Sequence, residues 1–439
     1  MPHSLRIALS LLILIVSGRD TFANAPKSSY IYLYVSDTTG ETFTLNFLDT
    51  VSLTLDHQIQ LAKPISFGIT AFLSPDGKWV AFLPATPSET IENIILYDIL
   101  NNETRSVPAH ISANFLFDSA ARVWGPSPSI LWSPDSMKLA FIGQINGDFT
   151  LGVYEINTDE TLYLPNTGSK YANLAWNSTS DELAVTAHTC DPICQPSIEI
   201  YNIPGQYLVS STNVLGPHGV FYPEYMCNLQ WSPDSMHISL VSFCGFDSFE
   251  DLKEVYILDR QTSTLINATH LTDHALPMTD PPNPELVGRF AAYDTLWISD
   301  DTIIIGATYS ETISSNRIAK TFLYNLNTQT LTSIGDVRGD EFALSASQIA
   351  ISTSNSDETL QDVRIVSLSD IASLQTQNSH LPGCQLDWHP IDNVLAYTNH
   401  GDAGSYCRDP IQSLVFIDDD GMREYPISDI VPIGWVSPP

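Results

Sequence analysis

The residues of this chain best suited to binding chemistry are arginines that have aromatic residues near them. Arginine offers a planar fork of donors and aromatic rings offer flat platforms, so both types are enriched where proteins bind ligands. Five arginines fall in segments predicted to be long loops: Arg122, Arg289, Arg317, Arg338 and Arg408. The accompanying aromatic residues are Trp124, Phe221, Tyr222, Tyr225, Tyr293, Tyr309 and Tyr406. The pattern favours an acidic or sugar-rich ligand, whereas the simpler interpretation is that these side chains only pack at a rim.

Two segments carry metal-ligating residue types, and both have a simpler interpretation. His270 and His274 have the four-residue spacing that aligns two ligands on a helix, but they lie in a segment rich in proline and aspartate. Asp418–Gly421 begins like a calcium loop, but it lacks the later glutamate and fits a hairpin turn. We therefore predict no metal and no cofactor; a bound calcium ion is compatible with the sequence but not indicated by it.

A recurring phrase shows which elements must position these residues. It reads Leu-Ser-Pro-Asp-Gly at Leu73–Gly77 and Trp-Ser-Pro-Asp-Ser at Trp132–Ser136 and Trp231–Ser235, each time before an apolar strand. Proline, serine and aspartate favour a tight turn, so each phrase predicts a hairpin whose first strand ends on the aromatic or leucine anchor. Weaker copies have their anchors at Trp176, Trp297, Leu344 and Trp388, and an eighth fragment begins at Trp435. A period of roughly 40–50 residues is typical of propellers and solenoids.

A second hairpin follows each anchor, which gives four strands per unit, the blade of an all-β propeller. The Trp-Ser-Pro-Asp phrase resembles the WD40-like repeat of TolB-type propellers, over about residues 29–439. The resemblance implies the fold. It does not imply TolB's own role, because TolB carries an extra domain for which this chain has no room.

The two ends of the chain are predicted to close the ring. The fragment at Trp435 supplies only an inner strand, and residues 30–35 and 42–47 supply strands without an anchor. Pairing these ends gives an eight-bladed propeller, which we favour. A seven-bladed ring with an extra N-terminal hairpin is the alternative.

Six cysteines predict three disulfides if the chain is exported. Cys227 and Cys384 occupy the same repeat position, four residues before an anchor, and Cys244 and Cys407 each follow the returning strand. We therefore expect Cys227–Cys244 and Cys384–Cys407, with Cys190–Cys194 as a small loop. A zinc site at Cys190 and Cys194 is the rival interpretation.

The net charge and the N-terminal segment limit the partners and the cellular location of the protein. The formal net charge of −32 argues against nucleic acid and against anionic membrane surfaces. Residues 1–25 have the layout of a secretory signal peptide, followed by one propeller domain at 26–439. No other segment is long and apolar enough to predict a membrane span. We expect a secreted protein, extracellular or periplasmic.

Two function classes remain. No Gly-x-Ser-x-Gly elbow, His-Glu-x-x-His motif or phosphate loop is present. We therefore predict an exported non-catalytic propeller that binds a protein, peptide or glycan through a loop-rich face. The alternative is an extracellular hydrolase or lyase acting on polysaccharide or peptide at the central channel, which converging carboxylates would favour.

Overall fold

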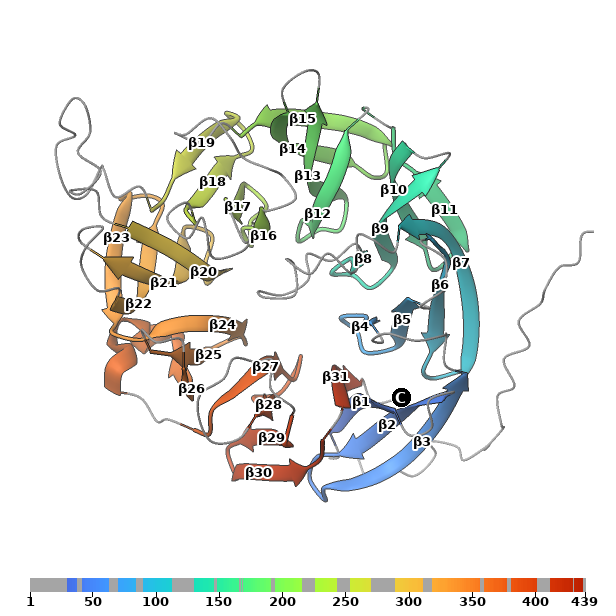
Figure 1. Cartoon of the computed structure of the whole chain (residues 1–439), viewed down its shortest axis with the longest axis vertical. Coiled ribbons are helices and arrows are strands. Elements are labelled where there is room, and N and C mark those ends of the chain that lie inside the picture. Colours follow the sequence, from blue (N-terminus) through green and yellow to red (C-terminus); the bar gives the residue numbers. More distant parts are fainter. Residues whose placement is uncertain are drawn as a thin grey trace, which may run out of the picture.

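Eight β-sheets are arranged in a ring in the computed structural model (Figure 1). The structure describes residues 30–37, 42–62, 70–83, 90–112, 130–145, 148–165, 167, 169–190, 194–214, 226–242, 253–269, 289–310, 318–355, 359–376, 380–400, 411–428 and 430–436. Consecutive strands pair antiparallel within each sheet, from the centre of the ring outwards. The chain therefore forms the β-propeller that the repeats predict.

The first four blades follow the anchors at Leu73, Trp132, Trp176 and Trp231. Blade 1 contains β4 (Thr70–Leu73), β5 (Trp79–Leu83), β6 (Thr90–Asp98) and β7 (Glu103–Ser112). Blade 2 contains β8 (Ile130–Trp132), β9 (Lys138–Ile145), β10 (Asp148–Glu155) and β11 (Glu160–Tyr163). Blade 3 contains β12 (Lys170–Trp176), β13 (Glu182–Cys190), β14 (Cys194–Asn202) and β15 (Tyr207–Asn213). Blade 4 contains β16 (Cys227–Trp231), β17 (His237–Val241), β18 (Val255–Asp259) and β19 (Thr264–Asn267).

The other four blades complete the ring. Blade 5 contains β20 (Arg289–Trp297), β21 (Thr302–Ser310), β22 (Ile318–Asn325) and β23 (Thr330–Gly335). Blade 6 contains β24 (Arg338–Leu344), β25 (Gln348–Ser354) and β26 (Leu360–Ser367). Blade 7 contains β27 (Gly383–Trp388), β28 (Leu395–Asn399), β29 (Ser413–Asp418) and β30 (Gly421–Pro426). Blade 8 contains β31 (Ile430–Val436), β1 (Ile31–Asp37), β2 (Thr42–Asp49) and β3 (Thr54–Ala62).

The two ends of the chain meet in blade 8. The C-terminal strand β31 is its innermost strand and pairs antiparallel with β1, from Ile31 opposite Val436 to Ser36 opposite Ile430. This pairing removes the open sheet edges that both terminal segments would otherwise carry. Closure by the two ends and the count of eight blades are both confirmed, and the seven-bladed alternative is excluded.

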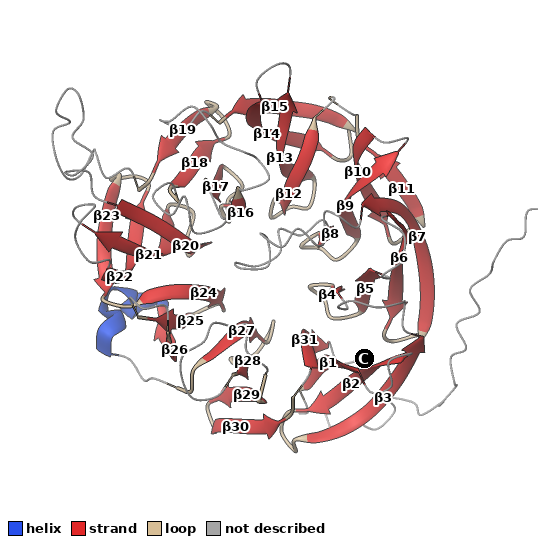
Figure 2. Ribbon diagram, in the orientation of Figure 1, coloured by secondary structure: helices blue, strands red, loops and turns tan. Residues whose placement is uncertain are grey.

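Blade 6 departs from the four-strand pattern. Its sheet has three strands among the described residues, and the 3₁₀ helix η3 (Leu368–Thr376) follows the third (Figure 2). Ile371 and Leu374 of η3 are buried in a hydrophobic cluster with Ile349 and Val366. The helix thus covers apolar surface that an outer strand covers in the other blades.

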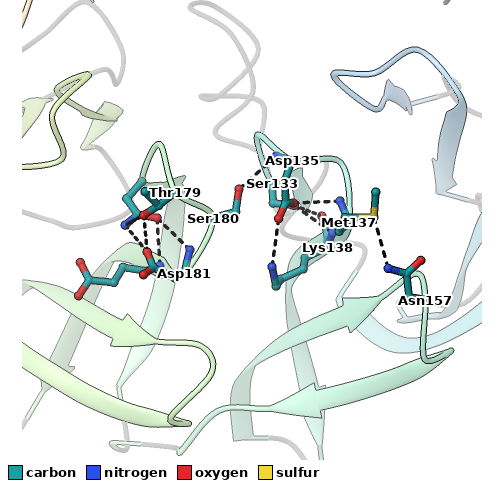
Figure 3. Close-up of polar contacts among 10 residues, drawn as sticks. Ser133, Asp135, Met137, Lys138, Asn157, Thr179, Ser180 and Asp181 are labelled. Carbon is teal, nitrogen blue, oxygen red and sulfur yellow. Dashed lines mark hydrogen bonds and ion pairs between the residues drawn. The ribbon is translucent and has the colours of Figure 1, made fainter.

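The recurring phrase forms the tight turn between the first two strands of a blade. In blade 2 the Ser133 hydroxyl donates to Asp135 Oδ1 at 2.5 Å (Figure 3). Ser136 then adopts a φ of 60°, a left-handed conformation that glycine takes easily, which explains Gly77 at the same place in blade 1. Ser180 of blade 3 accepts the Asp135 N–H at 3.1 Å (Figure 3). These turns therefore also link neighbouring blades.

Most anchor tryptophans join blades through the indole N–H as well as through packing. The acceptor lies in the neighbouring blade: it is the carbonyl of the residue directly before that blade's anchor. The N···O distances are 3.0–3.1 Å in the pairs Trp132–Phe72, Trp176–Leu131, Trp231–Ala175, Trp388–Ala343 and Trp435–Asp387. Trp297 differs, because its buried indole N–H has no acceptor among the described residues. At that interface Gln230 Nε2 donates instead to Thr295 O at 2.7 Å.

The hydrophobic core is divided among the blade interfaces. One cluster, for example, joins Leu96 of blade 1 with Phe141 and Tyr154 of blade 2. Burial of this kind stabilises by about 25 cal/mol per Å² of apolar surface, so each interface holds its two neighbours in place. Within the described part of the chain, no helix has the length and apolar character needed to cross a membrane.

Candidate functional site at the axis of the ring

The innermost strands of blades 3 to 7 each carry a polar residue three positions before the anchor: Asn173, Asn228, Asp294, Glu341 and Gln385. The strand pairing shifts register beside this position in every one of these blades. Such a bulge leaves a residue unpaired and re-aims its side chain. Because the innermost strands surround the centre of the ring (Figure 1), the repeat brings these distant polar residues to one axial wall.

Asp294 connects three blades. Its Oδ1 accepts Asn228 Nδ2 of blade 4 at 2.7 Å and the N–H of Thr295 at 2.9 Å. Its Oδ2 accepts the N–H of Phe342, in blade 6, at 3.1 Å. Both carboxylate oxygens are therefore used to hold neighbouring innermost strands.

Glu341 repeats the arrangement one blade further on. Its Oε2 accepts the N–H of Gln385 at 2.6 Å, and its Oε1 accepts the N–H of Leu386 at 2.9 Å, both in blade 7. Asp387, two residues later, is half-buried, and no described residue donates a hydrogen bond to its carboxylate. We call Asp294, Glu341 and Asp387 the axial carboxylates.

The protein raises the pKa of all three axial carboxylates. Burial and the charge of Glu341 together raise the pKa of Asp294 to about 8, against the opposing hydrogen bond from Thr295 N–H. Burial, with the nearby charge of Asp340, raises the pKa of Glu341 to about 7. Burial and the charge of Glu341 raise the pKa of Asp387 to about 7. The charge of Glu341 therefore disfavours ionisation of Asp294 and Asp387 at the same time.

This geometry limits the chemistry of the axial carboxylates. Both carboxylate oxygens of Asp294 and of Glu341 accept hydrogen bonds from backbone or amide donors. These two residues therefore link neighbouring blades. Asp387 is the member with a carboxyl group left to accept a proton or a ligand. In the described ranges no three His, Cys, Asp or Glu side chains form a group that could hold a metal ion.

A second group of side chains surrounds Tyr293, the residue before Asp294. The Arg338 guanidinium of blade 6 lies 3.8 Å from the ring centroid, and Lys253 Nζ of blade 4 lies 4.9 Å from it. Arg338 Nε also donates to Asp340 Oδ1 at 2.5 Å. The three side chains that meet here are at most 3% exposed. We call Lys253, Tyr293, Arg338 and Asp340 the Tyr293 cluster.

Cation–π contacts are worth about 2 kcal/mol or more when they are desolvated, as these are. The Tyr293 cluster therefore joins blades 4, 5 and 6. Ala292 N–H donates to Lys253 O at 2.8 Å, so the backbone of blade 4 is bonded to β20 beside the ring. The structure thus concentrates two cations at one place on a strongly acidic chain.

The structure brings some of the predicted site residues together and corrects where others lie. Tyr293 and Arg338 are in contact, as a shared site requires, but they lie in strands and not in loops. Arg289 is the first residue of β20, paired with Ser310, and Tyr309 lies in β21. Their backbone positions correct the loop assignment. The remaining predicted residues fall outside the described residues: Arg122, Trp124, Phe221, Tyr222, Tyr225, Arg317, Tyr406 and Arg408.

The described cysteines are consistent with the three expected disulfides, but the structure does not show every pair. Cys227 and Cys384 are buried at the start of their innermost strands, and neither is a free thiol. Cys190 and Cys194 lie directly opposite each other in the pairing of β13 with β14. Opposite residues of antiparallel strands are within disulfide range. Cys244 and Cys407 lie outside the described residues, so all three pairings stay predictions.

Sequence reasoning missed the axial carboxylates and Lys253. The sequence does carry a signal for Asp294 and Glu341. When the repeats are aligned on their anchors, these residues occupy the same position, three residues before the anchor, as Asn173, Asn228 and Gln385. No comparable signal marked Lys253, since its contact with Tyr293 depends on the spacing between two blades.

Comparisons with known proteins agree with the fold alone. No family model matches the chain, and no curated protein matches it. A solved structure of the dihydro-heme d1 dehydrogenase NirN in complex with DHE is similar over 92% of this chain and 75% of that one, with 11% identity and a TM-score of 0.53. The β-propeller domain of the Trilobed protease from Pyrococcus furiosus is similar over 90% of this chain and 98% of that one, with 12% identity and a TM-score of 0.41.

Proposed function

We propose that this chain is a secreted, non-catalytic propeller that binds a protein, peptide or glycan ligand where the connections between blades meet the axis of the ring. The observation that carries the proposal is the Tyr293 cluster. It fixes the adjacent N-terminal ends of β20 and β24, which begin at Arg289 and Arg338. Rigid strands that carry variable connections at their ends are a common way to build a binding surface.

Charge supports an acidic or hydroxyl-rich ligand. The chain has 50 acidic and 18 basic residues, so most of its surface repels an anion. The Tyr293 cluster places two buried cations, Lys253 and Arg338, beside the starts of β20 and β24. Arginine forks beside aromatic platforms suit carboxylates and sugar hydroxyls.

The state of the axial carboxylates supports binding over catalysis. A general acid or base must reach the proton that it transfers, and a nucleophile must be free to attack. Asp294 and Glu341 instead have both oxygens bonded to protein donors.

The test is a screen for binding followed by charge-matched variants. The chain is applied to arrays of acidic peptides and glycans, and affinities of the hits are measured by calorimetry. The double variant Arg289→Ala with Arg317→Ala should lower affinity at least about tenfold, which corresponds to about 1.4 kcal/mol. The control is Lys78→Ala with Lys138→Ala, which removes the same charge from residues paired with Asp76 and Asp135 at the tight turns. Equal affinities for the two double variants would refute the proposed site.

One observation favours the alternative, a hydrolase or lyase acting on polysaccharide or peptide. Asp387 has a pKa of about 7 and no hydrogen-bond donor from any described residue, which suits a general acid or base near neutral pH. Product release from polysaccharide or peptide pools, lost in Asp387→Asn, would establish the alternative and overturn the non-catalytic proposal.

A further inference from the structure

A cavity of about 390 Å³ lies between blades 1 and 2, away from the Tyr293 cluster. It is lined from both sides by the tight turns that join first to second and third to fourth strands. Blade 1 contributes residues such as Asp76, Trp79 and Arg105, and blade 2 contributes residues such as Met137 and Asn157. In an antiparallel meander these two classes of turn lie at the same edge, so the cavity belongs to the face opposite the connections between blades.

Arg105 crosses this cavity. Its guanidinium lies 4.8 Å from the centroid of the Trp79 ring, and its Nη1 donates to Ile156 O of blade 2 at 3.1 Å. It also hydrogen-bonds to the Tyr154 hydroxyl, and among the described residues no carboxylate pairs with it. An arginine that is always charged, has five donors and lies beside a cavity leaves donors for a ligand.

Blade 7 has an arginine at the same position, but there a carboxylate pairs with it. Arg423 lies opposite Phe416 as Arg105 lies opposite Leu96, and its Nε donates to Thr50 O of the next blade at 2.9 Å. Arg423 also pairs with Asp418 at 2.5 Å. The equivalent carboxylate in blade 1, Asp98, is taken up by its own turn.

The surroundings of Arg105 select the chemistry of the ligand. Asp98 accepts the N–H groups of Leu100 and Asn101 at 3.0 Å each and Asn101 Nδ2 at 2.8 Å, and Asp76 pairs with Lys78 at 3.0 Å. The cavity is lined by three carboxylates (Asp76, Asp98 and Asp159) and two cationic side chains (Lys78 and Arg105), so its nearly balanced charge favours neither an anion nor a cation.

What remains in the cavity suits a group that both donates and accepts hydrogen bonds. Asn101 and Asn157 carry amides of that kind. Trp79, Met137 and Ile156 add apolar surface, and Asn157 lies beside Met137 (Figure 3). Sugars combine hydroxyls with apolar ring faces in this way. The volume is at the small end of ligand sites, enough for one or two rings.

The geometry points to a second binding site, in which the cleft between blades 1 and 2 binds a neutral saccharide of one or two rings through Arg105, Trp79 and Asn157. This site does not depend on the proposed function, because it lies on the other face. The proposed sugar site thus lies at the tight turns, for which the sequence predicts no ligand.

The test uses the full chain with glucose, N-acetylglucosamine and lactose as probes, and titrations are followed by ligand-observed NMR. Sulfate, glucuronate and putrescine serve as anionic and cationic comparisons. At least one neutral sugar should bind with a millimolar Kd. Asn157→Ala should weaken it by about fivefold to tenfold, the loss expected from one hydrogen-bonding group.

The matched control is Gln261→Ala, at the equivalent exposed turn position of blade 4. It should leave the Kd unchanged, and neither variant should lower the unfolding temperature. A second variant, Asp159→Asn, keeps the side chain that meets the Tyr154 hydroxyl and removes one charge at the cavity wall. It should not weaken a neutral sugar more than twofold. Failure of all three sugars to bind, preference for a charged probe, or equal effects of Asn157→Ala and Gln261→Ala would each overturn the inference.

Discussion

Replacing Trp231 with phenylalanine tests how the blades are joined. The change keeps an aromatic ring in the core and removes the N–H that Trp231 donates to Ala175 O at 3.0 Å across the interface of blades 3 and 4. Trp297 supplies the matched control, because its indole N–H has no acceptor among the described residues. The two anchors are similarly buried, 8% and 3% exposed.

The magnitude follows from what each variant loses. Both variants lose the same ring volume, so the cost of the smaller side chain largely cancels in the comparison. Only Trp231→Phe leaves a buried carbonyl without its donor, and Ala175 is 5% exposed, so water cannot easily replace the indole. A buried acceptor left without a partner costs about 1–3 kcal/mol. Trp231→Phe should therefore lower the free energy of unfolding by about 1–3 kcal/mol more than Trp297→Phe.

Urea unfolding followed by circular dichroism measures both variants, and the shift of midpoint at constant slope gives the difference. Equal losses in the two variants would show that the indole hydrogen bond contributes nothing and that the anchors act by packing alone. A larger loss in Trp297→Phe would reverse the interpretation.

Three further predictions concern closure, pH and disulfides. Removing residues 430–439 deletes β31 and should destabilise the whole ring; unchanged thermal unfolding would contradict closure by the chain ends. Because the folded pKa of Asp294, about 8, lies above its ordinary value of 3.8, the folded state binds the extra proton, and stability should fall as pH rises through that interval. Between pH 5 and 8 Asp294→Asn should flatten this fall, and an unchanged slope would show that another group is responsible. Peptide mapping of the oxidised protein should find Cys227–Cys244, Cys384–Cys407 and Cys190–Cys194, and a pairing between blades would be incompatible with this set.

The ring could be predicted because its information is local and repeated. Each Ser-Pro-Asp turn is made by residues within a few positions of one another. The fragment at Trp435 contains only one strand of a blade, and the three strands within residues 31–62 complete that blade. The replacement of a fourth strand by η3 in blade 6 was not predicted. It depends on how Ile371 and Leu374 fill the space beside blade 6, which no local pattern encodes.

The candidate site was predicted less well because its contacts join different blades. Tyr293 and Arg338 are 45 positions apart in sequence, and each looks like a loop residue when only local composition is considered. In the sequence, Glu341 looks like an ordinary surface acid. In the structure, the bulge in β24 directs its carboxylate to the N–H groups of Gln385 and Leu386. Burial, which decides its pKa, is a property of the assembled ring.

Hydrogen exchange of the chain with and without the tightest-binding array ligand tests the proposed function most directly. Binding at the axis, where the connections between blades meet, predicts slower exchange in the first residues of β20 and β24, near Tyr293 and Arg338, and unchanged exchange in the tight turn at Ser133–Lys138. Protection confined to the tight turns, or turnover of the ligand during the measurement, would contradict a non-catalytic binding site at the Tyr293 cluster.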